Sequence, residues 1–282
     1  SLSLFSIISG IYYSWKYNSK FILEIRDIWP LSAMELGGYS KWHPLMLFMS
    51  TIEKIGYANA DFIVGTMPNL KEHVRKVNET KTDNVVCIPQ CFDEEFYVND
   101  QEELPKHIIE QYFSKNRFRM IYAGTISFNN PLNQLIDAMS GLDADLFIVG
   151  NGAAKQALKH KYQEMSNVYF MEAVPKNQVQ HLLSYSSCCY DSISSGIGQF
   201  GLSRNKWIDY MMAGKPIVCA FDGYHSMLNE AKSGFFVPFD NVRKLRNVIQ
   251  TLVSNPEGGL NLGRNGKKWL LENRSSKLLA KH

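Results

Sequence analysis

FRMIYAG at residues 118–124 and DLFIVGNG at residues 145–152 are two short apolar runs that each end in glycine. Runs of this length that stop at a turn residue predict buried strands. The segment 131–139 lies between them and has the pattern of a helix. Strand, helix and strand in this order predict a parallel βαβ unit.

The same alternation continues to the end of the chain and predicts one complete doubly wound domain with six strands. The predicted strands cover residues 118–123, 145–149, 168–171, 188–191, 216–220 and 234–238. The predicted helices cover residues 131–139, 153–165, 178–185, 203–212, 226–232 and 242–253.

The first part of the chain shows about half of that pattern. Strands are predicted at 21–26, 61–65 and 84–89, with helices at 44–57 and from Asn69. An open sheet exposes its edges, so we expect further strands upstream of the Ser at position 1. The predicted fold class is α/β, with two Rossmann-like domains facing a cleft and the N-terminal one incomplete. We predict a partial first domain at 1–98, a linker at 99–116 and a second domain at 117–282.

Composition narrows the class of protein. The 282 residues are 45% hydrophobic and 20% charged, which suits two globular cores. A net charge of +3 without basic clusters argues against nucleic acid as a partner. The five cysteines lack metal-ligand spacing and lie mostly in apolar runs, which predicts reduced core residues and a cytoplasmic location. The apolar start at residues 1–15 is too short for a membrane span.

Two glycine-containing loops follow predicted strands at the edge where parallel sheets bind ligands. Their candidate binding residues are Gly124, Thr125, Gly150, Asn151 and Gly152. Glycine lets backbone amides approach an anion at a helix N-terminus, but turns also require glycine, so both interpretations stay open.

The strongest signal lies at residues 201–216, GLSRNKWIDYMMAGKP. Ser203 is the expected N-cap of a helix that ends at Gly214. Arg204 and Lys206 would then lie in the first turn, where the helix dipole disfavours cations by about 0.3–1 kcal/mol each. A bound diphosphate would compensate, and Asp209 on the same face would accept hydrogen bonds from a ribose diol. The alternative is a surface ion pair between Lys206 and Asp209.

Asp27 directly follows the strand predicted at 21–26, so it belongs at the ligand-binding edge of the first sheet. The adjoining Trp29-Pro30 pair restricts the loop that carries it. We predict Asp27 as a catalytic residue, and a structural ion pair between Arg26 and Asp27 is the alternative.

Several motifs together resemble the family four retaining glycosyltransferases. They are EIRDIWP at 24–30, IPQCFD at 88–93, AGT at 123–125, VGNG at 149–152 and KWIDYMMAGKP at 206–216. The resemblance spans nearly the whole chain. It is greatest to bacterial members that build surface polysaccharides, such as capsule or O-antigen, and transfer acetamido sugars.

The resemblance implies a GT-B fold and a nucleotide-sugar donor, expected to be a uridine diphosphate sugar, without cofactor or catalytic metal. Carried over by position, Gly124 and Thr125 would face the diphosphate, and Val174 would pack near the nucleobase. The implied contacts of the diphosphate and sugar are Ser203, Arg204, Asn205 and Lys206, with Asp209 on the ribose.

The implied acceptor is a polysaccharide or a lipid-linked glycan, which carries with it contact to the inner face of a membrane. The sequence hints at such contact only through Trp15, Lys16, Trp42 and Phe48.

The chain departs from the family pattern at several positions. Gly201 stands where the first of two glutamates is usual, and Asp209 replaces the second. The customary Arg and Lys are absent between Ile126 and Gln134, and Gln90-Cys91 replaces an Asn-Gly pair. These departures leave the donor sugar open.

Three other functions compete. A nicotinamide oxidoreductase would use Gly150-Asn151-Gly152 and Glu172, although Lys155 stands at its third glycine. A nucleotide-sugar epimerase has the same two-domain architecture. A non-catalytic partner subunit would keep the fold without turnover.

Overall fold

The computed structural model describes residues 4–79, 83–127, 131–193 and 197–281. Its internal contacts divide the chain into two compact units. The N-terminal unit comprises Ser1–Pro89, Ser195–Ser203 and Gly223–Ser226. The C-terminal unit comprises Gln90–Ser194, Arg204–Asp222 and Met227–His282. Each unit is described by itself below.

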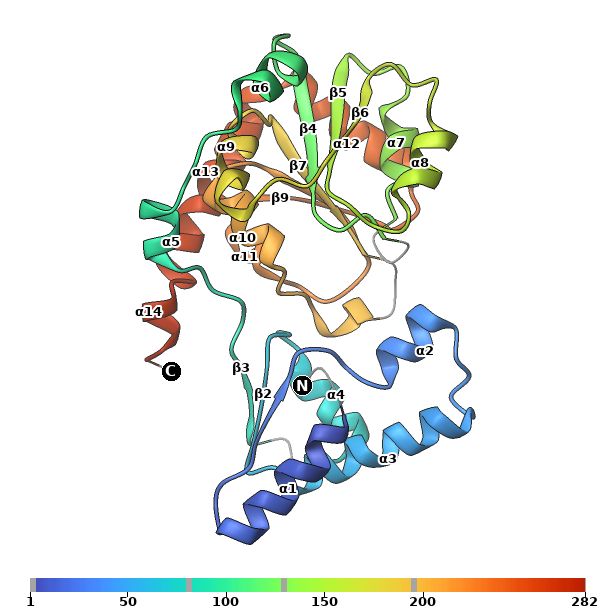
Figure 1. The fold of residues 1–282 in the computed structure, drawn as a ribbon, viewed down its shortest axis with the longest axis vertical. Helices are drawn as coiled ribbons and strands as arrows, with labels where there is room; N and C mark the ends of the chain where they lie inside the picture. The colour runs from blue at the N-terminus through green and yellow to red at the C-terminus, as the bar shows by residue number, and fades with distance from the viewer. Residues whose placement is uncertain (1–3, 80–82, 128–130, 194–196, 282) are drawn as a thin grey trace. The chain divides into compact units, whose positions relative to one another are not determined.

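The N-terminal unit is a three-stranded parallel sheet with helices (Figure 1). Its elements are α1 (Phe5–Tyr17), β1 (Ile22–Ile25), α2 (Leu31–Gly37), α3 (Pro44–Asn59), β2 (Phe62–Gly65), α4 (Leu70–Val77), β3 (Val85–Cys87) and the 3-10 turn η2 (Ile197–Phe200). The strand order is β1-β2-β3, with Ile22 opposite Phe62 and Ile63 opposite Val85. Three strands at the predicted places confirm the sequence analysis.

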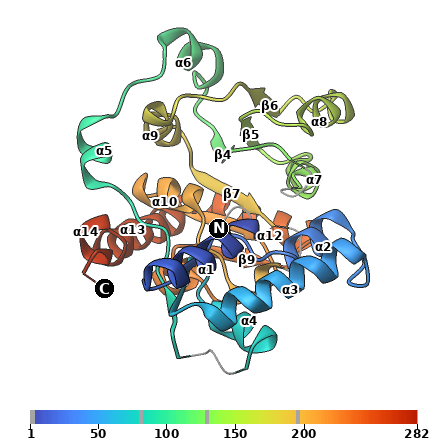
Figure 2. The same ribbon diagram turned by 60° about the horizontal axis from the view of Figure 1, so that its bottom comes forward.

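One buried cluster forms the core of this unit. Helices α1 and α3 lie side by side over the sheet (Figures 1 and 2), and their apolar residues pack on alternate strand positions. The cluster contains Ile7, Leu23, Ile25, Ile52, Tyr57, Ile63, Leu70, Val74 and Phe200. Phe200 explains why residues 195–203, predicted in the second domain, group with the N-terminal unit. Its ring lies 5.1 Å from that of His73.

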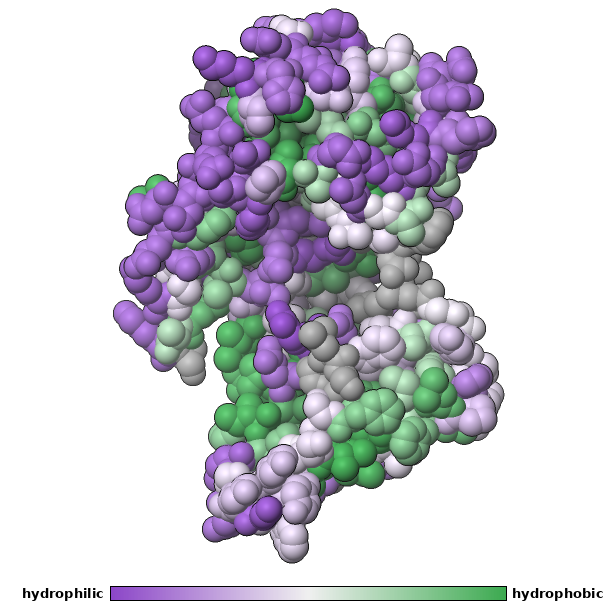
Figure 3. Space-filling view, in the orientation of Figure 1, coloured by the Kyte–Doolittle hydropathy of each residue, from purple (hydrophilic) through white to green (hydrophobic). Residues whose placement is uncertain are grey.

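The remaining surface of this unit carries many apolar side chains. In the space-filling view, hydrophobic residues gather over α3 and at β2 and β3 (Figure 3). Trp15 is 80% exposed, Trp42 is 71% exposed and Phe48 is 50% exposed. No helix in the described parts of the chain combines the length and the apolar content needed to cross a membrane.

The C-terminal unit is a six-stranded parallel sheet in the order β6-β5-β4-β7-β8-β9. Its strands are β4 (Phe118–Ala123), β5 (Ala144–Val149), β6 (Val168–Met171), β7 (Cys188–Ser192), β8 (Ile217–Ala220) and β9 (Gly234–Val237). The order runs outward in both directions from β4 and β7, which is the doubly wound topology predicted from the alternation.

Helices cover both faces of this sheet (Figures 1 and 2). The helical elements of this unit, not all of which lie on the sheet, are α5 (Glu94–Asn99), α6 (Lys106–Tyr112), α7 (Asn133–Met139), α8 (Lys155–Lys161), the 3-10 turn η1 (Lys176–Gln178), α9 (Val179–Ser184), α10 (Asn205–Met212), α11 (Met227–Ala231), α12 (Val242–Ser254), α13 (Pro256–Asn273) and α14 (Ser276–Leu279). Because both faces are covered, every residue of β5 is buried, which explains its unbroken apolar run.

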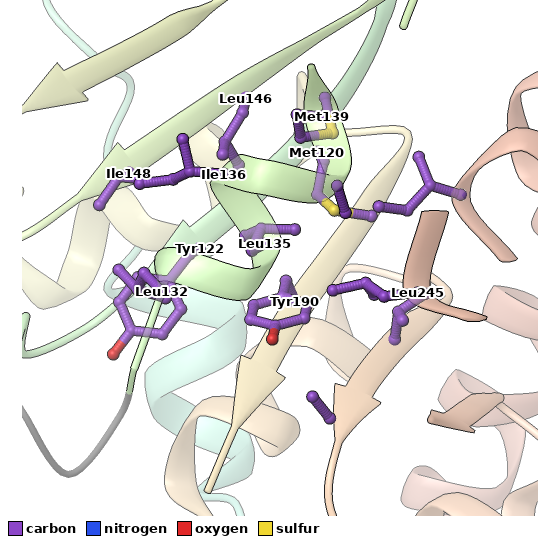
Figure 4. Packing of buried hydrophobic residues seen from close by; sticks show 14 of the residues in the cluster. Met120, Tyr122, Leu132, Leu135, Ile136, Met139, Leu146, Ile148, Tyr190 and Leu245 are labelled. Atoms are coloured by element: carbon purple, nitrogen blue, oxygen red, sulfur yellow. The ribbon is translucent and has the colours of Figure 1, made fainter. Parts of the chain in front are cut away.

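The core under α7 illustrates the packing (Figure 4). Leu135, Ile136 and Met139 of α7 pack on strand residues that include Met120 and Leu146. Burial of each such side chain contributes about 1.5–3 kcal/mol. This packing holds α7 against β4 and β5, the strands from which the two glycine loops follow.

Residues 90–116 belong by contact to the C-terminal unit. The predicted linker at 99–116 contains α6, and Phe113 behind it is buried, with its ring stacked 4.7 Å from that of Tyr185. The backbone NH of Phe92 donates to the carbonyl of Arg274 at 3.0 Å. These contacts hold the segment against the second sheet.

The cysteines fall into two groups. Cys188, Cys189 and Cys219 are buried in the strands of the second sheet, as predicted. Cys87 and Cys91 are exposed, which corrects their assignment to the core. Cys87 ends the short strand β3, whose last two residues face solvent.

Candidate functional site

A cavity of about 530 Å³ opens beyond the carboxyl ends of β4, β5 and β6 in the C-terminal unit. Doubly wound sheets bind their ligands at this edge. The predicted residues that line it are Gly124, Thr125, Gly150, Asn151, Val174, Asn205, Lys206 and Asp209. Ala123, Val149, Ala173, Lys176, Val179 and Tyr210 complete the wall. The structure thus gathers most of the predicted donor residues around one space.

The two glycine loops after β4 and β5 are joined by backbone hydrogen bonds. The NH of Gly124 donates to Val149 at 3.0 Å, and the NH of Ile126 donates to Asn151 at 2.9 Å. Gly150 has φ 143°, and a Cβ there would lie 2.0 Å from the carbonyl oxygen of Gly124. Glycine at 150 is therefore a packing requirement.

Gly152, two residues after Gly150, is also required by close backbone packing. Its Cβ would lie 2.1 Å from the carbonyl oxygen of Ile126, and it is not among the residues that line the cavity. Gly124 differs, because it lines the cavity and a Cβ there would meet the ammonium of Lys206 at 3.0 Å. Backbone packing therefore explains the glycine at position 152. Gly124 remains a candidate for anion binding, because it lines the cavity beside the Lys206 ammonium.

Helix α10 begins two residues later than predicted. Arg204 is its N-cap, with extended backbone at φ −105° and ψ 133°, and no side chain caps the first turn. The assignment of Ser203 as N-cap was therefore wrong, and Ser203 belongs by contact to the N-terminal unit. The predicted end is confirmed, since Gly214 follows the helix with φ 66°.

The two cations at the start of α10 share a carboxylate that the sequence analysis missed. The Nε of Arg204 lies 3.0 Å from Oδ2 of Asp191, and the Nζ of Lys206 lies 3.1 Å from Oδ1. Asp191 is fully buried near the end of β7. The sequence offered one signal, a carboxylate in an otherwise apolar strand. One internal anion thus balances one of the two cations.

Lys206 is the cation that lines the cavity. Its ammonium lies 3.1 Å from the hydroxyl of Tyr122 and 4.2 Å from the centre of that ring. Burial lowers the pKa of Lys206, whereas the adjacent Asp191 raises it and Arg204 lowers it further. A second anion in the cavity would stabilise the charged form.

Asp209 is buried in the wall and already has partners. The hydroxyl of Tyr97 donates to its Oδ1 at 2.6 Å, and the ammonium of Lys176 contacts both carboxylate oxygens, with Oδ2 at 2.6 Å. Burial, followed by the charge of Asp209, raises the pKa of Tyr97 far above its ordinary value. The alternative interpretation, an ion pair of Asp209 with Lys206, is therefore wrong, because Asp209 pairs with Lys176.

The residues that a dinucleotide site would use, at positions 151, 155 and 172, contact one another through their side chains. Lys155 donates to the side chain of Asn151 at 3.0 Å and to Glu172 at 2.7 Å. Glu172 is not among the residues that line the cavity. The carboxylate that a nicotinamide oxidoreductase would need for its ribose is thus paired with the lysine that stands at the third glycine position.

Asp27 lies in the N-terminal unit, two residues beyond the end of β1, and its side chain is exposed. Its carbonyl accepts a hydrogen bond from the NH of Trp29 at 3.2 Å, which shapes the loop. Arg26 lies 3.8 Å from Glu24 rather than pairing with Asp27. The catalytic role of Asp27 stays a prediction. Within the described ranges, no group of three His, Cys, Asp or Glu residues is placed to hold a metal ion.

Comparison with known proteins adds a family to this geometry. The family model "Glycosyl transferases group 1" matches residues 105–269, more than half of the chain. No curated protein sequence matches the chain significantly.

Solved structures share the fold at low identity. Sucrose-phosphate synthase from Thermosynechococcus elongatus has TM-score 0.73 and 16% identity, covering 96% of this chain and 69% of its own. Anabaena HepE in complex with UDP has TM-score 0.77 and 13% identity, covering 99% and 75%. WaaG, a glycosyltransferase involved in lipopolysaccharide biosynthesis, has TM-score 0.71 and 13% identity, covering 92% and 73%.

The family match falls mostly on the unit that carries the cavity, and the motifs quoted from the sequence predicted the same family. This chain belongs to the group 1 glycosyltransferases, the retaining family that its sequence resembles.

Proposed function

We propose that this chain transfers a sugar from a uridine diphosphate donor to a polysaccharide or lipid-linked glycan acceptor. The observation that carries the proposal is the cavity wall, where the Gly124-Thr125 loop and the Lys206 ammonium converge. Backbone amides and a buried cation at one point favour a phosphate group. HepE has been solved with UDP and with UDP-glucose, and this supports a uridine nucleotide.

The other walls of the cavity suit the nucleobase and the ribose of the donor. We place the nucleobase against the apolar wall of Ala173, Val174 and Val179. Asp209 would accept from the ribose hydroxyls, exchanging its contact with Lys176 for them. A volume of about 530 Å³ lies within the usual range for ligand sites.

Retaining transfer in such a site depends on the leaving group. As the bond from the sugar to the diphosphate breaks, negative charge develops on the phosphate oxygens. The preorganised amides and the Lys206 ammonium would stabilise that charge more in the transition state than in the ground state. The acceptor hydroxyl then attacks from the same face and passes its proton to the phosphate oxygen that leaves the sugar, so no separate general base is required. We assign Asp27 to orienting the donor sugar or the acceptor.

An acetamido sugar is the donor that we favour, on the sequence resemblance. A matching structure of TarM from S. aureus contains UDP together with alpha-GlcNAc-glycerol, which supports this choice.

A thermal-shift screen of nucleotides and nucleotide sugars tests the donor site. We expect UDP sugars to stabilise the parent chain, and Lys206→Ala and Asp209→Ala to lose most of that stabilisation. Lys268→Ala is the matched control, because Lys268 lies on α13 outside the cavity. Equal stabilisation of all four proteins by UDP would place the nucleotide elsewhere.

We also propose contact with a membrane surface through exposed aromatic residues of α1 and of the segment before α3. Trp15 on α1 and Trp42 before α3 are largely exposed. The ammonium of Lys16 lies over the ring of Tyr12, and that of Lys41 over the ring of Trp42. Aromatic rings with lysine side chains beside them are typical of surfaces that rest in a lipid headgroup region. A lipid-linked acceptor would be reached from such a surface.

A further inference from the structure

We propose that Asp191 is a positioning residue of the donor site, holding Lys206 next to Arg204 so that the positive charge of the Lys206 ammonium faces the cavity. The inference rests on the proposed function, because it assigns that charge to the donor's diphosphate. Asp191 is not among the residues that line the cavity, so it acts through its partners.

The geometry uses both oxygens of the carboxylate. Oδ1 accepts from the NH of Ser192 at 2.9 Å and contacts Lys206, and Oδ2 accepts from the indole NH of Trp207 at 2.9 Å and contacts Arg204. Four donors from β7 and the start of α10 thereby fix the direction of the carboxylate. A fixed carboxylate in turn fixes the Lys206 ammonium beside Gly124.

The charge balance explains why an aspartate suits this place. Asp191 is fully buried, and the side chains of Lys206 and Arg204 are 14% and 22% exposed. In the described part of the chain, Asp191 is thus shared by two cations in a poorly solvated place. A buried cation is more stable with an anion beside it, and an incoming diphosphate would bring a further anion to the Lys206 ammonium. The site is thus prepared for an anion.

In the ranges that the structure describes, four groups influence the protonation of the Lys206 ammonium. They are Asp191 on β7, Arg204 at the N-cap of α10, Tyr122 on β4 and Cys219 on β8. Burial and Arg204 both lower the pKa of Lys206, and Asp191 raises it. Without the carboxylate, Lys206 would lose its proton at a lower pH, and the cavity would lose its cation with it.

The test is the dissociation constant of UDP, measured by calorimetry on the full chain between about pH 7 and pH 10.5, the region where a lowered lysine pKa is expressed. Asp191→Asn keeps the shape and, with its oxygen toward Trp207, that acceptor; it removes the charge and the oxygen that accepts from Ser192 and Lys206. We expect its UDP affinity to decline about one pH unit or more below the pH at which the parent declines, since a close opposite charge shifts a pKa by about 1–3 units.

A double-mutant cycle separates positioning from folding. In a Lys206→Met background, Asp191→Asn should change UDP affinity much less than it does in the parent, because its effect passes through Lys206. Asp145→Asn is the matched control, since Asp145 is also buried and lies 2.8 Å from an arginine, Arg117. It should lower stability without changing the pH profile of UDP binding.

Arg204→Met gives a second test should Asp191→Asn not fold. Removing the neighbouring cation should move the decline in UDP affinity to higher pH, the opposite direction. Parent-like affinity and pH profile in Asp191→Asn, or an equal loss in both backgrounds, would overturn the positioning role. If Lys206→Met itself binds UDP as tightly as the parent, the donor-site assignment fails instead.

Discussion

Lys176 contacts both carboxylate oxygens of Asp209 in the wall of the candidate donor cavity. The carboxylate that we assign to the ribose is therefore already paired, by a side chain that is 54% exposed and so free to move away. Tyr97 holds the same carboxylate from α5 at 2.6 Å. Ribose binding should exchange one of these contacts and keep the other.

Lys176→Met should tighten UDP binding by a factor of about 3 to 10, because the ribose no longer competes with an ammonium group for Asp209. Its cost in stability should be about 1–3 kcal/mol, because Asp209 is buried and loses one partner, although it keeps the hydrogen bond from Tyr97. Calorimetry and chemical denaturation measure the two effects. Lys176→Arg is the control, because it keeps the competing cation, and weaker UDP binding in Lys176→Met would mean that Lys176 contacts the nucleotide.

Gly150→Ala should destabilise the C-terminal unit by at least about 3 kcal/mol, from backbone strain and overpacking together. The added methyl group would lie 2.0 Å from the carbonyl oxygen of Gly124, and φ is 143°. Gly141→Ala is the control, because its φ is 66° but nothing lies within 4 Å of the added atom. Its cost should be near the 1–2 kcal/mol of a left-handed residue alone, about half as large. Similar urea midpoints for the two variants would contradict the packing account.

Alkaline pH should destabilise the protein through its buried thiols. Burial raises the pKa of Cys189 to about 12 from an ordinary value of 9.0. A raised folded-state pKa means that the unfolded chain loses this proton first, so the contribution is intact below pH 9 and declines as pH rises toward 12. Within that window one group contributes about 1.4 kcal/mol per pH unit to the slope.

Cys189→Ala should flatten the pH dependence of the free energy of unfolding by about that amount between pH 9 and 11. Cys87→Ala, at an exposed position, should leave the slope unchanged. Denaturation at four or five pH values measures both. An unchanged slope in Cys189→Ala would show that the thiol is reached by solvent.

Vesicle sedimentation tests the membrane surface. The parent should sediment with vesicles that contain phosphatidylglycerol, and Trp15→Ser with Trp42→Ser should reduce the bound fraction several-fold, by about 1 kcal/mol or more of lost burial. Tyr224→Ser, also an exposed aromatic but in the segment 223–226, is the control. Equal binding by the parent and the double variant would exclude Trp15 and Trp42 as membrane contacts.

The sequence predicted the second sheet almost completely, because strands buried on both faces leave an unbroken apolar signal. Helix α13 escaped prediction because Gly258, Gly259, Gly263 and Gly266 lower its helix propensity. The structure shows their use at Gly263, where a Cβ would lie 1.9 Å from the carbonyl oxygen of Gly214. Close helix packing, a long-range property, outweighs local propensity here.

The site was predicted less fully than the sheet. Spacing along α10 found Lys206 and Asp209, because both lie on one helix face and face one cavity. It missed Asp191, Tyr97 and Lys176. Asp191 lies 15 positions before its partner Lys206, and Tyr97 and Lys176 lie 112 and 33 positions before their partner Asp209. Charge arguments confined to one helix could not see that a carboxylate on β7 already balances one cation.

A crystal structure of the chain with UDP is the most direct test of the donor site. The account predicts the diphosphate within hydrogen-bonding distance of the Lys206 ammonium and the amides of Gly124 and Thr125, with the ribose on Asp209. UDP bound at full occupancy away from this cavity, with Lys206 still paired only to Asp191 and Tyr122, would contradict it.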